Sequence, residues 1–133
     1  MATFRKFEEI QCWQKARELT AKVYTISKRH PFAGDFGLKD QIRRASVSIM
    51  SNIAQGFERD GSAECVQFLS IAKGSAAEVR CQLYVAADQC YIDDEEVGEL
   101  STLAAQTGSM TAGLITYLRR SGYKETKYKT SRS

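Results

Sequence analysis

The sequence predicts an all-α protein, an antiparallel up-down-up-down bundle of four helices. Apolar residues recur at steps of three and four in four long segments, which is the spacing of amphipathic helices. The chain has a single proline, Pro31, and only a few residues join the segments. Such short connections imply that consecutive helices run antiparallel. With 133 residues, 43% of them apolar, we expect one bundle domain over residues 1–122 and a tail over residues 123–133.

The first two predicted helices span Glu8–His30 and Leu38–Phe57, and Pro31 ends the first because proline cannot continue a helix. Their expected core stripes are Trp13, Ala16, Leu19, Val23 and Ile26, then Leu38, Ile42, Ala45, Ile49, Asn52, Ile53 and Gly56. Asn52 is a polar residue on an apolar stripe, and a buried amide needs hydrogen bonds. We interpret Asn52 as a structural residue that fixes helix register, with contact to a ligand as the alternative.

The third predicted helix spans Ser62–Tyr91, and Asp93 or Asp94 caps the fourth. The core stripe of the third comprises Cys65, Phe68, Leu69, Ala72, Ala76, Val79, Leu83, Ala86 and Cys90. The seam of the fourth comprises Val97, Leu100, Ala104, Thr107, Thr111, Leu114 and Leu118. Acidic Glu95 and Glu96 suit its start, and the end of the helix is marked by Arg119, Arg120 and Gly122.

The third helix carries more apolar surface than one core requires. A second stripe lies about 110° around the helix from the first, and it comprises Val66, Ala77, Tyr84 and Tyr91. A large exposed apolar surface usually marks an interface. We therefore predict that the second stripe forms subunit contacts in a homo-oligomer. The alternative is that a long helix simply has a wide sector facing the core.

The sequence contains no pattern of an enzyme or metal site. It has no phosphate-binding glycine loop, no G-x-S-x-G and no nucleophile paired with His30, the single histidine. The cysteines, Cys12, Cys65, Cys81 and Cys90, are not clustered as zinc ligands would be. This favours small buried hydrophobic residues in a reducing compartment. No signal peptide or membrane span is recognisable. We expect a soluble cytoplasmic protein with no enzymatic activity, cofactor, metal or small-molecule substrate.

Charge is unevenly distributed along the chain. The net charge of +3 is the sum of +5 over residues 1–44, −5 over residues 45–122 and +3 over residues 123–133. We therefore expect the basic first and second helices to be set apart from the acidic start of the fourth, and the basic tail to be mobile.

Basic residues are the candidate functional set. Lys15, Lys22 and Arg29 recur every seven positions, which we place on the side of the first helix opposite its apolar stripe. The other clustered cations are Arg43, Arg44, Arg119 and Arg120, and the tail interleaves lysines with tyrosines. Basic groups beside aromatic rings are typical of surfaces that bind phosphates and bases. An ordinary solvated charged surface is the alternative.

Four blocks of sequence carry a family resemblance: FEEIxxWQKAREL from Phe7, FGLxxQIRRASVSI from Phe36, SNIAxGF from Ser51 and GSAAE from Gly74. In these blocks the chain resembles the proteins encoded within intervening sequences of 23S rRNA, often called S23 ribosomal proteins. The likeness runs over about residues 4–118. Relatives commonly have proline where this chain has Met50 and glutamate where it has Gln55. Without that proline, we expect the second helix to be straighter.

The resemblance implies a small bacterial four-helix bundle without established enzymatic activity, and pentameric rings are known among similar bundles. More distantly, the chain is similar to the accessory variability proteins of diversity-generating retroelements, basic pentameric barrels that bind a reverse transcriptase and its RNA. By this analogy, the nucleic-acid-binding residues would be Lys15, Lys22, Arg29, Arg43, Arg44, Arg119 and Arg120.

We therefore hypothesise a ring-like homo-oligomer, with a pentamer favoured by the resemblance, that binds RNA, DNA or a nucleic-acid-protein complex. It would act as an accessory to a reverse transcriptase or in association with 23S rRNA. The rival hypothesis is a protein-interaction scaffold that does not contact nucleic acid.

Overall fold

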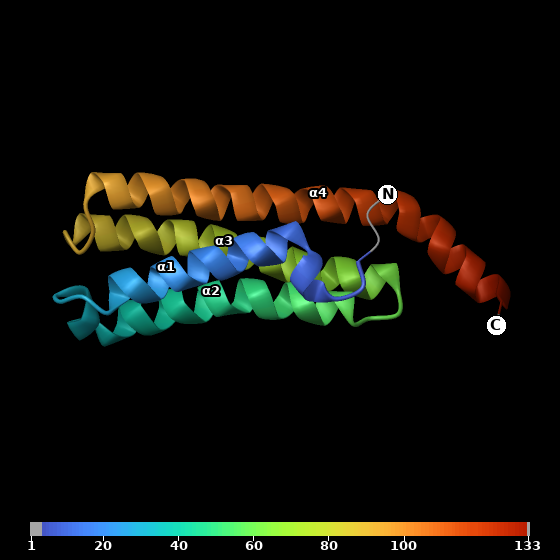
Figure 1. Ribbon diagram of the computed structural model, residues 1–133, viewed down its shortest axis with the longest axis horizontal. Helices are drawn as coiled ribbons and strands as arrows, with labels where there is room; N and C mark the ends of the chain where they lie inside the picture. Colours follow the sequence, from blue (N-terminus) through green and yellow to red (C-terminus); the bar gives the residue numbers. More distant parts are fainter. Residues whose placement is uncertain (1–3, 133) are drawn as a thin grey trace.

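The computed structural model describes the backbone of residues 4–132 and the side chains of residues 4–121. Over these residues the chain is helical and contains no strand. The elements are η1 (Phe7–Glu9), α1 (Gln11–Ser27), η2 (Phe32–Gly34), α2 (Phe36–Phe57), α3 (Ser62–Asp88) and α4 (Asp94–Arg132). The α1–α2 and α3–α4 connections lie at one end of the molecule and the α2–α3 connection at the other (Figure 1). The predicted four-helix, all-α architecture is confirmed.

Each helix has two neighbours around a single core. Both α1 and α3 contact α2 and α4, so the core lies along the axis between the four helices. The predicted α1 stripe from Trp13 to Ile26 is buried, as are Ile42 and Ile49 of α2 and Leu83 of α3. Burial of each large apolar side chain contributes roughly 1.5–3 kcal/mol. No helix in the described part of the chain combines the length and apolar character that crossing a bilayer requires.

α1 is shorter than predicted at both ends. It begins at Gln11 because Ile10 is extended, with φ −75° and ψ 124°, and this turn of the backbone places the Ile10 side chain in the core. The ring of Phe7 packs edge-on against Trp13, with the ring centroids 5.2 Å apart. At the other end, α1 stops at Ser27, before Pro31.

α2 begins two residues earlier than predicted, at Phe36. The cap is Asp35, whose Oδ1 accepts a hydrogen bond from the Leu38 N–H at 3.1 Å, and such a bond satisfies a backbone donor of the first turn. The helix then continues without interruption to Phe57, through the half-buried Met50 that stands where relatives commonly have proline.

α3 ends at Asp88, so the prediction that it extends to Tyr91 is wrong. Cys90 has a positive φ of 61°, and this left-handed residue turns the chain so that the Tyr91 N–H donates to the Ala86 carbonyl at 2.9 Å. The Tyr91 ring stacks on Phe32, with centroids 5.1 Å apart. Tyr91 therefore belongs to the α3–α4 connection and not to the second stripe of α3.

α4 is capped by Asp93, one of the two residues predicted for this role. The Glu96 N–H donates to Asp93 Oδ1 at 2.9 Å, and the Asp93 N–H donates to Glu96 Oε1 at 3.1 Å, which is a reciprocal capping box. The helix runs to Arg132, so the predicted end at Gly122 is wrong. An interior glycine costs only about 1 kcal/mol relative to alanine, so it does not by itself end a helix. The tail side chains lie outside the described residues.

Candidate nucleic-acid interface

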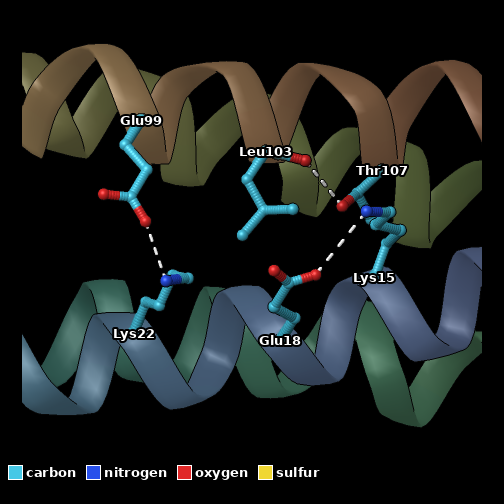
Figure 2. Close-up of polar contacts among 6 residues, drawn as sticks. All are labelled: Lys15, Glu18, Lys22, Glu99, Leu103 and Thr107. Carbon is cyan, nitrogen blue, oxygen red and sulfur yellow. Dashed lines mark hydrogen bonds and ion pairs between the residues drawn. The ribbon is translucent and has the colours of Figure 1, made fainter.

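The basic ladder, as we call Lys15, Lys22 and Arg29, runs along α1 and just past its end, and each of its members is paired with a carboxylate. Lys22 Nζ lies 2.7 Å from Glu99 Oε1, and Arg29 Nη2 lies 2.7 Å from Glu96 Oε2. Lys15 Nζ lies 3.6 Å from Glu18 Oε2, one turn further along its own helix. Figure 2 shows the Lys22 and Glu99 side chains pointing toward each other across the gap between α1 and α4.

This arrangement corrects two predictions. The ladder lies on the flank of α1 beside α4, not on the side opposite its apolar stripe. The acidic start of α4 is also not set apart from the basic first helix, because Glu96 and Glu99 project directly at it. The hydrogen bond with Glu99, reinforced by its charge, raises the pKa of Lys22. A phosphate approaching this flank would meet cations whose charge a carboxylate already offsets.

The two arginines predicted on α2 differ in their partners. Arg44 Nε pairs with Asp40 Oδ2 at 2.8 Å, one turn away. Arg43 Nε instead donates to the buried Ser27 Oγ at 2.8 Å, and its guanidinium carbon lies 4.4 Å from the ring centroid of Tyr24. This cation–π contact holds Arg43 against α1. Among the described side chains, Arg43 has no ion pair with a carboxylate.

A groove between α3 and α4 contains the cations that are best placed to meet an anion. This α3–α4 groove has a volume of about 440 Å³ and is lined by Ser70, Lys73, Gly74, Ala77, Ala112, Ile115, Thr116 and Arg119. Its lining contains two exposed cations, Lys73 and Arg119, and no carboxylate. Neither cation forms an ion pair with any described side chain. The small side chains of the lining, such as those of Gly74 and Ala77, leave open space between Lys73 and Arg119.

The positive surface continues beyond the α3–α4 groove. Exposed Arg80 lies two helical turns, about 10.5 Å, along α3 from Lys73, and exposed Arg120 follows Arg119. Sequence reasoning missed Lys73 and Arg80. Their seven-residue spacing was a usable signal, but they are interleaved with Val66, Ala77 and Tyr84, which we had interpreted as an apolar stripe.

The predicted oligomer contacts lie in different environments. Val66 is half-buried against the core, and Ala77 lines the α3–α4 groove. Tyr84 is 56% exposed. Tyr91 makes contacts within its own chain, because its hydroxyl donates to Asp35 Oδ2 at 2.9 Å and its ring stacks on Phe32. The structure therefore does not bring the four together as one exposed stripe.

Asn52 is half-buried and hydrogen-bonded within its own helix. Its Nδ2 donates to the Ser48 carbonyl at 2.8 Å and to Ser48 Oγ at 3.0 Å. The link to α3 is made one step further on, by Ser48 Oγ and Ser75 Oγ, 3.0 Å apart. Sequence reasoning placed the amide in the core and missed this serine pair, which carries the polar contact between the helices.

The thiols and carboxylates form no metal-binding group within the described residues. Cys12 is buried, and burial raises the pKa of its thiol. Cys65 is half-buried, whereas Cys81 and Cys90 are exposed, so the prediction that the cysteines are buried is wrong for these two.

The described chain is thus an all-helical bundle with one ion-paired flank and one groove bearing cations without paired carboxylates. The chain belongs to the 23S rRNA-intervening sequence protein family, whose model matches residues 8–113. It is similar in structure to a protein of unknown function from the S23 ribosomal protein family of Bacteroides thetaiotaomicron VPI-5482. That likeness has a TM-score of 0.72 at 20% sequence identity and covers 78% of this chain and 97% of that one. No curated protein gave a significant sequence match.

Proposed function

We propose that this protein binds RNA without catalysis and holds the phosphate backbone in the α3–α4 groove. The observation that carries the proposal is the pairing of Lys73 with Arg119 across a groove that has no carboxylate in its lining. Cations that are not already neutralised release the counterions of a bound phosphate chain, which is the main source of such affinity.

Two of the seven predicted cations support the proposal, since Arg119 lines the α3–α4 groove, Arg120 follows it, and neither forms an ion pair with a described carboxylate. The family is named for an intervening sequence of 23S rRNA, which favours RNA over DNA. Association with 23S rRNA is accordingly the first candidate setting, and service as an accessory to a reverse transcriptase is the second. We place the protein in the cytoplasm, because the exposed free thiols of Cys81 and Cys90 suit a reducing compartment.

The assembly we propose is a ring of antiparallel up-down-up-down bundles, with a pentamer as the family resemblance suggests. Tyr84 is the exposed large side chain of the predicted second stripe, so it is the residue we place in the subunit contact. Tyr84 lies eleven residues from Lys73, about 16 Å along α3, which leaves the Lys73–Arg119 end of the groove open to RNA.

The proposal is tested by the salt dependence of RNA binding, measured by fluorescence anisotropy with a labelled single-stranded RNA. Neutralising Lys73→Gln together with Arg119→Gln should weaken binding and reduce the slope of log K against log salt by about 2, one for each lost phosphate contact. The matched control, Lys15→Gln with Lys28→Gln, removes the same charge from α1 and from the residue that follows it, and should leave the slope unchanged. Absence of binding at low salt, or equal effects of both pairs, would refute the groove assignment.

A protein-interaction scaffold is the second candidate function, and exposed apolar side chains favour it. Ile71 and Val85 of α3 are 53% and 43% exposed, and their spacing of 14 residues places them on one face of the helix. In a pull-down, the scaffold is favoured if a partner protein stays bound after nuclease treatment and in high salt. An Ile71→Lys, Val85→Lys variant should then lose that partner. RNA binding that these substitutions do not affect would favour the first proposal.

A further inference from the structure

One end of the bundle is incompletely filled by helices. α1 has 17 residues, whereas α2 has 22, α3 has 27 and α4 has 39. Because α1 begins only at Gln11, residues 4–10 cross the end of the bundle near the α2–α3 connection in place of a fourth helix (Figure 1). A cavity of about 280 Å³ remains beneath this segment.

The wall of this end cavity is mostly apolar. It includes Phe4, Ile10, Ile53, Leu69, Leu114 and Leu118, drawn from the N-terminal segment and from α2, α3 and α4. Ile53 and Leu69 are fully buried by the bundle, so the inner wall is rigid core. An apolar cavity of about 150 Å³ is enough to bind benzene, and a space nearly twice as large accommodates about ten carbon atoms.

The mouth of the end cavity is polar. Arg59 and Asp60 of the α2–α3 connection line it, together with Ser62, the first residue of α3. The Arg59 guanidinium carbon lies 4.6 Å from the ring centroid of Phe68, which holds the cation beside the opening. Within the described residues, Arg59 has no ion pair with a carboxylate.

We propose that the end cavity is a binding site for a small anionic amphiphile, of the chemical class of medium-chain carboxylic acids. The alkyl chain lies among the apolar side chains of the wall, where burial removes it from water. The carboxylate lies at the mouth and accepts hydrogen bonds from Arg59, the geometry for which a guanidinium is suited. This site is separate from the α3–α4 groove, and the inference does not depend on RNA binding.

Decanoate is a suitable probe, with decanol as its uncharged counterpart, in calorimetric titrations of the full chain. We expect saturable 1:1 binding of decanoate to the wild type. Arg59→Gln should weaken decanoate binding by roughly tenfold, because a charge-assisted hydrogen bond is lost, and should leave decanol binding unchanged. Arg59→Lys should restore part of the loss. Lys73→Gln, in the other groove, should have no effect on either ligand.

The site itself is located with the wild-type chain, which avoids any question of misfolding in a variant. Cys65 lines the end cavity, whereas Cys81 and Cys90 are exposed elsewhere on α3 and in the turn that follows it. Decanoate should slow alkylation of Cys65 and leave the alkylation rates of Cys81 and Cys90 unchanged, as measured by peptide mass spectrometry. Equal rates at Cys65 with and without ligand, or absence of saturable binding, would overturn the proposal. An equal effect of Arg59→Gln on acid and alcohol would overturn the carboxylate assignment.

Discussion

The hydroxyl of Tyr91 joins two connections at one end of the bundle. It donates to Asp35 Oδ2 at 2.9 Å, while Asp35 Oδ1 accepts the Leu38 N–H that caps α2. The ring of Tyr91 stacks on Phe32, which is fully buried in the α1–α2 connection. One carboxylate therefore both starts α2 and anchors the chain after α3. The hydrogen bond to Asp35, assisted by burial, raises the pKa of Tyr91.

This raised pKa predicts how stability depends on pH. A group whose pKa is higher in the folded than in the unfolded state stabilises the fold below its unfolded value, about 10 for tyrosine. That contribution is lost as the pH rises through the higher folded value. Tyr91→Phe should therefore be less stable than the wild type at pH 7, and the difference should shrink in alkaline solution. Urea denaturation at pH 7 and in alkaline solution measures the difference in the free energy of unfolding between variant and wild type. Tyr84→Phe, at an exposed tyrosine, is the control. A difference independent of pH would contradict the prediction.

At the scale of elements, α2 and α3 pack tightly against each other at Gly56. A Cβ atom at this position would lie 3.2 Å from the Cys65 carbonyl oxygen and 3.2 Å from Phe68 Cβ. One of these neighbours is backbone, which cannot rotate away as a long side chain can. The absence of a side chain at Gly56 thus sets how closely the second and third helices pack at this end.

We predict that Gly56→Ala destabilises the protein by about 1–3 kcal/mol through overpacking, although alanine favours a helix by about 1 kcal/mol over glycine. The matched control is Gly98→Ala in α4, where a Cβ atom would have nothing within 4 Å. That change should be neutral or stabilising by up to about 1 kcal/mol. Chemical denaturation of both variants measures the contrast, and equal stability of the two would show that the helices can separate at no cost.

At the scale of the whole molecule, folding sorts the charges into surfaces that composition does not reveal. The cations of α1 meet the acidic first turns of α4, so this side of the bundle is largely self-neutralised. Lys73, Arg80 and Arg119 lie on the side formed by α3 and α4, away from those carboxylates. An anionic partner would therefore be attracted to one face of a bundle whose overall charge is small.

Assembly is also a property of the whole molecule, and Tyr84→Glu tests it. If Tyr84 forms the proposed subunit contact, the charge should lower the sedimentation mass of an oligomeric wild type to that of a monomer, since an unpaired buried charge is costly. Gln67→Glu adds the same charge to another side of α3 and should leave the mass unchanged. A monomeric wild type would rule out the ring. Tyr91→Glu should instead lower stability, because Tyr91 belongs to the fold.

The pattern of apolar residues was sufficient to predict the four helices and most of the core. Residues on one helix face have to leave water whichever helices they meet, so Leu19, Ile49 and Leu83 could be assigned to the core without knowing their neighbours. The cap at Asp93 was also predictable, because it depends on a contact between residues only three positions apart and not on how the helices pack.

Only the tertiary structure decided where the helices end and which cations remain without an ion pair. α1 starts late because Ile10 packs into the core, and α3 stops early because Tyr91 reaches Phe32 and Asp35. Lys22 is neutralised by Glu99, which is 77 positions away along the chain. Local sequence cannot encode such partners, because a contact between distant residues depends on how the whole chain packs. The ladder that the sequence displays most clearly is therefore ion-paired, and the cations of the α3–α4 groove, which it displays less clearly, are the candidate site.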